Sequence, residues 1–152
     1  MIALTIIALA LGAVGAVWDI LHRRIPNWLC AIFAFACATR LVWIDGWEAL
    51  GSGGLHAVLA LIVGMLLFRL GWFGGGDAKF YTAAALGTPL GSAIGLLFWT
   101  AIGGLGLVVV FGMLRLISRT RDKDRAKRLA ILPYGVAISI GFAVTVMFNP
   151  II

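Results

Sequence analysis

Charged side chains are scarce in this chain of 152 residues: they make up 12% of it, about half the fraction of a typical soluble protein. Hydrophobic residues make up 62%, and the mean hydropathy is +1.09. A soluble domain of this size would need far more polar surface to cover its core. The composition therefore excludes a soluble enzyme and a disordered chain, and it predicts a polytopic integral membrane protein.

Cysteine is also scarce, and its placement excludes two further kinds of structure. Cys30 and Cys37 are the only cysteines, and they lie seven positions apart in one predicted helix. This spacing corresponds to a rise of roughly 10 Å, above the limit of about 7 Å for a disulfide, and it is not a zinc-binding spacing. We expect two small core residues, in a protein that uses no metal or other cofactor.

Apolar segments recur along the whole chain, and most approach the ~20 residues that a spanning helix needs. The fourth segment is short and ends at the turn 87–91, so it could also merge with the fifth and leave five spans. We predict an all-α polytopic membrane protein, one integral-membrane domain over 1–152, with about six transmembrane helices and a short fourth helix. The six segments are 1–17, 28–44, 54–70, 80–90, 91–114 and 129–148.

Basic residues predict the orientation. Eleven of the 12 lysines and arginines fall in alternate loops on one side, and only Arg40 falls on the other. The positive-inside bias makes the basic side cytoplasmic and places both chain ends outside. The longest polar stretch, 118–128, is predicted to be a cytoplasmic loop near anionic lipid headgroups. Positive charge confined to short loops is not a solvated basic face, so we expect the lipid bilayer and no nucleic acid as a partner.

The first apolar segment has an alternative explanation as a cleaved signal peptide. Ala8-Leu9-Ala10 offers a small-residue cleavage pattern. However, no positive region precedes it, and the apolar run continues past this site to Val17. We therefore expect a spanning helix.

Only two of the acidic residues lie at membrane depth. Asp19 ends the first apolar segment, and Asp77 follows three glycines at the mouth of the fourth. The predicted topology places both at the cytoplasmic side, where an unpaired carboxylate would be costly, so we expect them to meet in a functional site. The other four acids lie in predicted loops, where water solvates them: Asp45, Glu48, Asp122 and Asp124.

Each of the two aspartates also has a purely structural explanation. Arg23, one turn later, could neutralise Asp19, and Asp77 could be the N-cap of the fourth helix. Taken together on one side of one membrane, the pair favours catalysis. Two facing carboxylates in a low-dielectric cleft share a proton, so one can activate water while the other protonates a scissile carbonyl oxygen. Nearby His22 is expected to be an interfacial residue.

Several motifs resemble one group of membrane proteases. Gly74-Gly75-Gly76-Asp77 fits the Gly-x-Gly-Asp signature of polytopic membrane aspartyl proteases. The resemblance covers nearly the whole chain in order and spacing. Three further elements are similar to the type IV prepilin peptidases: Asp19 with Arg23-Arg24-Ile25-Pro26-Asn27, Asp77-Ala78-Lys79, and Pro133-Tyr134-Gly135.

The resemblance implies an aspartic endopeptidase that removes the basic leader from type IV prepilins or pseudopilins. It places this activity at the cytoplasmic face of the bacterial inner membrane and implies pilus or secretion assembly machinery as a partner. Asp19 and Asp77 would be the catalytic pair. The remaining matched positions, for substrate or motif roles, are Arg24, Pro26, Asn27, Gly74, Gly75, Gly76 and Lys79.

Longer members of this family carry an N-terminal insertion with paired CxxC motifs and also methylate the new amino terminus. No such insertion exists here, so the chain resembles the short, peptidase-only branch associated with Flp/Tad-type pili. Two alternatives stay open: a small proton- or cation-coupled transporter, and a non-catalytic assembly subunit. A transporter is expected to bind its ligand near the bilayer midplane, whereas both aspartates lie at the ends of predicted spans.

Overall fold

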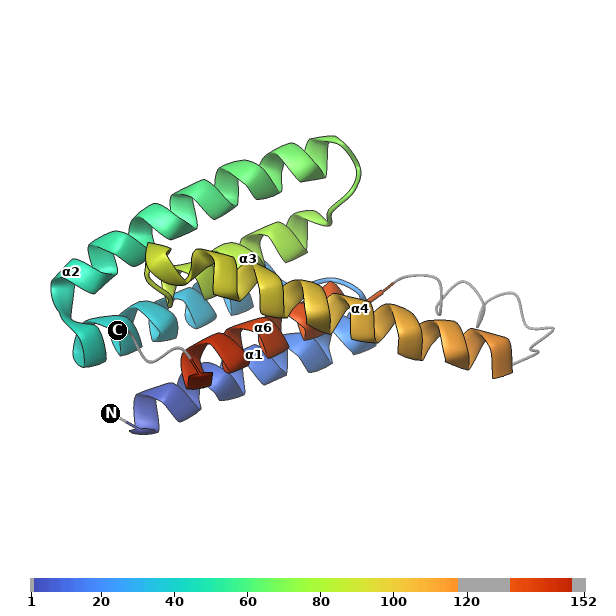
Figure 1. Ribbon diagram of the computed structural model, residues 1–152, viewed down its shortest axis with the longest axis horizontal. Coiled ribbons are helices and arrows are strands. Elements are labelled where there is room, and N and C mark those ends of the chain that lie inside the picture. Colours follow the sequence, from blue (N-terminus) through green and yellow to red (C-terminus); the bar gives the residue numbers. More distant parts are fainter. Residues whose placement is uncertain (1, 118–131, 149–152) are drawn as a thin grey trace.

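The computed structural model describes residues 2–117 and 132–148, and its regular structure there is helical, as predicted (Figure 1). The basic stretch 118–128, with Asp122 and Asp124, lies outside the described residues. The helices are α1 (Ile2–His22), α2 (Asn27–Arg69), α3 (Gly75–Leu86), the short 3-10 turn η1 (Leu90–Ser92), α4 (Ala93–Ile117) and α6 (Tyr134–Phe148).

Helix α2 folds back on itself at Gly46. This glycine has φ 87° and ψ 179°, a backbone conformation outside the helical region that side chains disfavour. A straight helix of 43 residues would be about 65 Å long, roughly twice the hydrocarbon thickness of a bilayer. The bend divides α2 into a first arm, 27–45, and a second arm, 47–69, which correspond to the second and third predicted segments (Figure 1).

The turns before and after α3 set where this short helix begins and ends. Gly71, with φ 74°, ends α2, and Gly74 is the N-cap of α3. Helix α3 therefore begins five residues before the predicted apolar segment, because the glycines form its first turn. Gly87, Thr88 and Pro89 then separate α3 from η1 and α4, so the alternative in which the fourth and fifth segments merge is wrong.

Three helical stretches of the described chain are long and apolar enough to cross a membrane: Ile2–His22, Asn27–Arg69 and Leu90–Leu114. The apolar helix α6 is shorter, with 15 residues, and α3 has 12. These lengths agree with a membrane protein but do not confirm six spans. The three stretches include both arms of α2 as one helix, and α3 and α6 are each shorter than the ~20 residues that a spanning helix needs.

Aromatic side chains from three helices form the centre of the core. Phe33 of the first arm, Phe80 of α3 and Phe142 of α6 are fully buried. The ring centroid of Phe33 lies 4.9 Å from that of Phe80 and 5.2 Å from that of Phe142. Close packing of this kind matters in a bilayer, where lipid tails are as apolar as the side chains. Cys30 and Cys37 belong to this core as free thiols, which confirms their predicted structural role.

Arg40, the one basic residue predicted on the outside, points into the bundle. Its Nε donates to Thr5 Oγ1 at 3.2 Å, and its Nη1 donates to the Gly87 carbonyl oxygen at 3.4 Å. Asp45 lies half-buried within electrostatic range of this guanidinium, and its Oδ2 is buried without a hydrogen-bond partner in the described structure. Asp45 is therefore less exposed than expected for a solvated acid, whereas Glu48 is exposed as expected.

The helix ends gather the candidate functional segments. The bend of α2, the start of α1 and the end of α6 lie at one end of the bundle (Figure 1). The α1–α2 connection, the α2–α3 connection and the start of α6 lie at the other end (Figure 1). This second end carries both aspartates and all of the motif residues named above.

Candidate active site

Asp19 lies near the end of α1 and is buried, with a relative exposure of 5%. Arg23 ends this helix with φ 56°, a left-handed conformation, and its backbone N–H donates to the Asp19 carbonyl oxygen at 2.8 Å. The backbone N–H of Gly135, at the start of α6, donates to Asp19 Oδ2 at 2.9 Å. Two helices distant in sequence therefore fix the Asp19 carboxylate.

Gly135 has little room for a side chain. A Cβ atom there would lie 3.0 Å from Asp19 Cβ and 3.1 Å from Ile25 Cδ1. The glycine thus allows the backbone of α6 to approach α1 closely enough for the hydrogen bond to Asp19. This gives the Pro133-Tyr134-Gly135 element a physical role that the sequence alone did not reveal.

Asp77 lies in the first turn of α3, three residues after the N-cap Gly74. The suggestion that Asp77 is itself the N-cap is therefore wrong. The carboxylate instead reaches back and accepts a hydrogen bond from the Gly74 backbone, as an acid in a capping box does. The Asp77 side chain is half-buried, and the charge of Asp19 lies within electrostatic range of it.

Both aspartates line one cavity of about 340 Å³. The same cavity is lined by the three glycines and by residues of the α1–α2 connection. The Ile25 backbone lies so near Gly76 that a Cβ atom on this glycine would be 3.4 Å from Ile25 N. The remaining lining residues are Arg23, Arg24, Asn27 and Leu132.

A hydrogen bond joins the two halves of the site. Lys79 Nζ donates to Asn27 Oδ1 at 2.9 Å, so the residue that follows Gly-Gly-Gly-Asp-Ala holds the residue that begins α2. Pro26, as the N-cap of α2, adopts an extended conformation with ψ 145° and sets where this helix starts. Lys79 and Pro26 are not among the residues that line the cavity, so both act from its edge.

Arg23 and His22 both follow Asp19 closely in sequence, but only Arg23 lines the cavity. Arg23 is within electrostatic range of Asp19, and its guanidinium lies 5.7 Å from the ring centroid of Phe111. His22 is exposed and stacks on Trp18 with ring centroids 4.7 Å apart. Since His22 does not line the cavity that contains the aspartates, its expected interfacial role fits this placement.

The arrangement is suited to acid–base chemistry by two carboxylates. A protonated and an ionised aspartate in one half-enclosed cavity can polarise a carbonyl and activate water at the same time. Among residues 2–117 and 132–148, no group of three or more His, Cys, Asp or Glu side chains could hold a metal ion. The sequence analysis named Gly135 and Ile25 only as parts of motifs and assigned them no role, because the role of each depends on its position beside Asp19.

Comparison with known proteins matches similar lengths of this chain to a peptidase family and to a transport protein. The family described as the type IV leader peptidase family matches residues 5–113, which include both aspartates but end before Gly135. The inner membrane transport protein YajR of Escherichia coli (strain K12) is 32% identical over an alignment of 108 positions that covers 68% of this chain. The matched part is 23% of YajR, so the chain spans about a quarter of that protein. No solved structure matches the chain.

Proposed function

Because the chain belongs to the type IV leader peptidase family, we propose that it is an intramembrane aspartyl endopeptidase. Its substrates are type IV prepilins or pseudopilins of the Flp type, and it removes their basic leader at the cytoplasmic face of the bacterial inner membrane. The observation that carries this proposal is the cavity shared by Asp19 and Asp77. Pilus or secretion assembly machinery then receives the product.

The proposed mechanism uses the two carboxylates as one unit. Asp77 holds the proton that the two carboxyl groups share in their common cavity and donates it to the scissile carbonyl oxygen. Asp19, held by the Gly135 N–H, accepts a proton from water as the water oxygen attacks the carbonyl carbon. A tetrahedral diol results. Asp19 then donates the proton it took from water to the leaving nitrogen while Asp77 accepts a proton from a diol hydroxyl, so the C–N bond breaks and leaves a new carboxyl and a new amino terminus.

The glycines and the α1–α2 connection are proposed to bind the peptide around the scissile bond. Gly75 and Gly76 line the cavity with backbone alone, so an extended chain can approach the dyad without meeting a side chain. Arg24 and Asn27 present polar groups at the same cavity, and Lys79 and Pro26 hold this connection in place. We therefore expect the glycines and the residues of this connection to position the substrate and not to transfer protons.

Incubation of the purified protein with a candidate Flp-type prepilin tests the proposal directly. We expect a product shortened by the leader, with an unmodified amino terminus even when S-adenosylmethionine is present, because the chain carries no CxxC insertion. Mass spectrometry measures both features. An uncleaved prepilin would argue for the assembly-subunit alternative, and a methylated product would mean that a methyl-transfer site exists in the chain.

The proposed topology has six spans: α1, the two arms of α2, α3, α4 and α6, in one membrane domain with both chain ends outside. Trp72 and Trp47 are both about three-quarters exposed and lie in the α2–α3 connection and at the α2 bend. Cysteines placed singly at these positions should be labelled from opposite sides, Trp72→Cys from the cytoplasm and Trp47→Cys from outside. The native thiols are buried and should stay unlabelled. Labelling of both positions from one side would overturn the six-span topology.

The similarity to YajR keeps a transporter as the second candidate. In that case Asp19 and Asp77 would bind a proton or cation during transport. Transporter sites lie near the bilayer midplane, between broken helices. Here Asp19 ends α1 and Asp77 begins α3, so both carboxylates lie at helix ends. The similarity also lies in apolar segments, which are built from few residue types in any membrane protein. It is therefore weaker support for a transporter than the two aspartates at helix ends are for a peptidase.

A further inference from the structure

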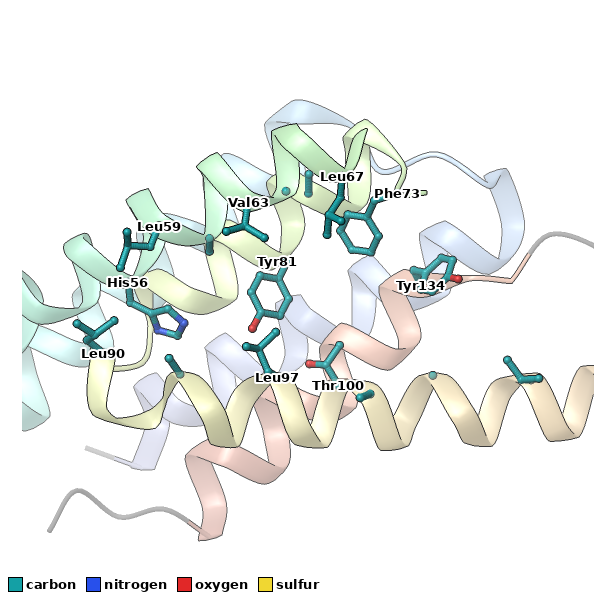
Figure 2. Close-up of a pocket in the computed structure, with 17 residues that line it drawn as sticks. His56, Leu59, Val63, Leu67, Phe73, Tyr81, Leu90, Leu97, Thr100 and Tyr134 are labelled. Atoms are coloured by element: carbon teal, nitrogen blue, oxygen red, sulfur yellow. The ribbon is translucent and has the colours of Figure 1, made fainter. Parts of the chain in front are cut away.

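A second cavity, of about 510 Å³, lies on the other side of α3 from the first arm, and Figure 2 shows the side chains that line it. It is a groove between the second arm of α2 and helix α4. Helix α2 packs mainly against α3 and α4 packs mainly against α6, whereas α2 and α4 do not pack extensively against each other in the described structure. Two apolar helices are therefore held apart, and the space between them is open at the protein surface, where the lining residues Val63 and Leu97 are more than half exposed.

The groove is long, narrow and apolar. Its lining runs from His56 to Leu67 on the second arm and from Ala93 to Val108 on α4. At 1.5 Å per residue these stretches are about 17 and 22 Å long, so the groove follows the helices over three to four turns. In the membrane such a surface must be covered by apolar groups, either from lipid or from protein.

One end of the groove adjoins the candidate active site. Phe73 and Tyr134 meet there with ring centroids 5.7 Å apart and a tilt of 62° between the rings (Figure 2). Phe73 directly precedes Gly74, which binds Asp77, and Tyr134 directly precedes Gly135, which binds Asp19. A chain lying in the groove would therefore reach the two aspartates by passing this aromatic pair.

The Tyr81 hydroxyl indicates the chemistry of the occupant. Tyr81 lies one turn after Asp77 on α3 and points toward α4 (Figure 2). Its Oη is buried and has no hydrogen-bond partner in the described part of the chain. An unpaired hydroxyl in an apolar site costs free energy, and a lipid tail has no acceptor to offer it. A peptide that unwinds near its cleavage site does offer a hydrogen-bond acceptor, because its carbonyl groups lose their helical partners.

We propose that this groove binds the apolar helical segment of the substrate that adjoins the scissile bond. The inference rests on the proposed peptidase function. The helix lies between the second arm and α4, unwinds beside Tyr81, and passes Phe73 and Tyr134 into the cavity that contains Asp19 and Asp77. The Tyr81 hydroxyl donates a hydrogen bond to a carbonyl oxygen of the unwound segment.

Two substrates separate this inference from the proposed function. One is a prepilin with its apolar segment, in proteoliposomes, and the other is a short soluble peptide that spans only the cleavage site. Ala101 lines the groove on an exposed face of α4, so Ala101→Trp fills the space. We expect kcat/KM for the prepilin to fall at least about tenfold while that for the short peptide is unchanged. Ile94→Trp is the matched control, because Ile94 is 81% exposed on the same helix outside the groove.

Cross-linking provides a readout that does not depend on activity. When a mild oxidant such as copper phenanthroline is added, Ala101→Cys should form a disulfide with a cysteine in the apolar segment of the prepilin, and Ile94→Cys should not. Tyr81→Phe should raise KM for the prepilin by about three- to tenfold, the effect of one lost hydrogen bond. Unchanged prepilin cleavage by Ala101→Trp, with no cross-link at Ala101, would assign the groove to lipid and overturn the inference. Failure of the unmodified protein to cleave either substrate would instead reject the peptidase function, and the inference with it.

Discussion

Replacing Asp19 or Asp77 by asparagine is expected to lower the rate of prepilin cleavage by roughly 10²–10⁴-fold, the contribution of a general acid or base. An amide can neither accept a proton from water nor donate one as a carboxylic acid does. Since the two side chains share one cavity and act as one unit, the double variant should be barely slower than either single variant. Cleavage of one prepilin, normalised to enzyme in the membrane, measures the effect.

Glu48→Gln is the appropriate control for the charge change. Glu48 is exposed at the far end of the bundle. The Glu48→Gln variant should therefore cleave the prepilin as fast as the unmodified protein does. The Asp→Asn variants should also insert and fold, because they nearly preserve volume and remove a charge that is costly at membrane depth. Substantial activity in Asp19→Asn or Asp77→Asn would reject the two-carboxylate mechanism and favour the transporter or assembly-subunit alternatives.

Gly74→Ala is expected to be the most damaging of the three glycine-to-alanine changes in the Gly-Gly-Gly-Asp motif. A Cβ atom on Gly74 would lie 2.5 Å from Asp77 Oδ2, so the carboxylate must move. The end of an aspartate side chain moves easily, and the φ of −74° and ψ of 142° at Gly74 suit alanine, so stability should change little. Displacing a catalytic group by about 1 Å costs about 10²-fold in rate, and we expect a loss of this size in kcat.

Gly75→Ala provides the matched comparison. A Cβ atom on Gly75 would lie 3.4 Å from the Phe68 ring, an ordinary contact that leaves Asp77 in place. Because Gly75 is proposed to contact the peptide, we expect Gly75→Ala to raise KM while kcat stays within about threefold of the unmodified protein. Cleavage rates and thermal unfolding of the two variants in the same detergent make the test. Equal losses of activity in Gly74→Ala and Gly75→Ala would mean that the motif acts through backbone flexibility and not through the position of Asp77.

Hydropathy and charge were enough to predict the helices and to bring the two aspartates together. The predicted apolar segments correspond to α1, the two arms of α2, α3, α4 and α6, since each apolar run needs a helix to satisfy its backbone in lipid. The shared side of Asp19 and Asp77 followed from the alternation of basic loops. The three glycines looked equivalent in sequence, and only the structure distinguishes Gly74 by its distance to Asp77.

Contacts between distant segments could not be predicted from local patterns. The hydrogen bond from Gly135 to Asp19 joins positions 116 residues apart, and that from Lys79 to Asn27 joins positions 52 residues apart. The groove was equally hidden, because α4 is apolar on every side and its sequence does not distinguish a face toward lipid from a face toward a peptide. The partial burial of Asp45 was hidden for a related reason, since Arg40, within electrostatic range of it, points into the bundle despite lying near the end of the first arm.

The hydrogen bond between Gly135 and Asp19 also has a consequence for the biosynthesis of the protein. The two candidate catalytic residues are translated early, on α1 and α3, but the N–H that fixes Asp19 belongs to the last described helix. A nascent chain that has inserted α1 to α4 therefore holds both carboxylates without the group that orients one of them. The complete site forms only when α6 docks against α1, so a partly synthesised chain in the translocon does not yet contain an assembled protease.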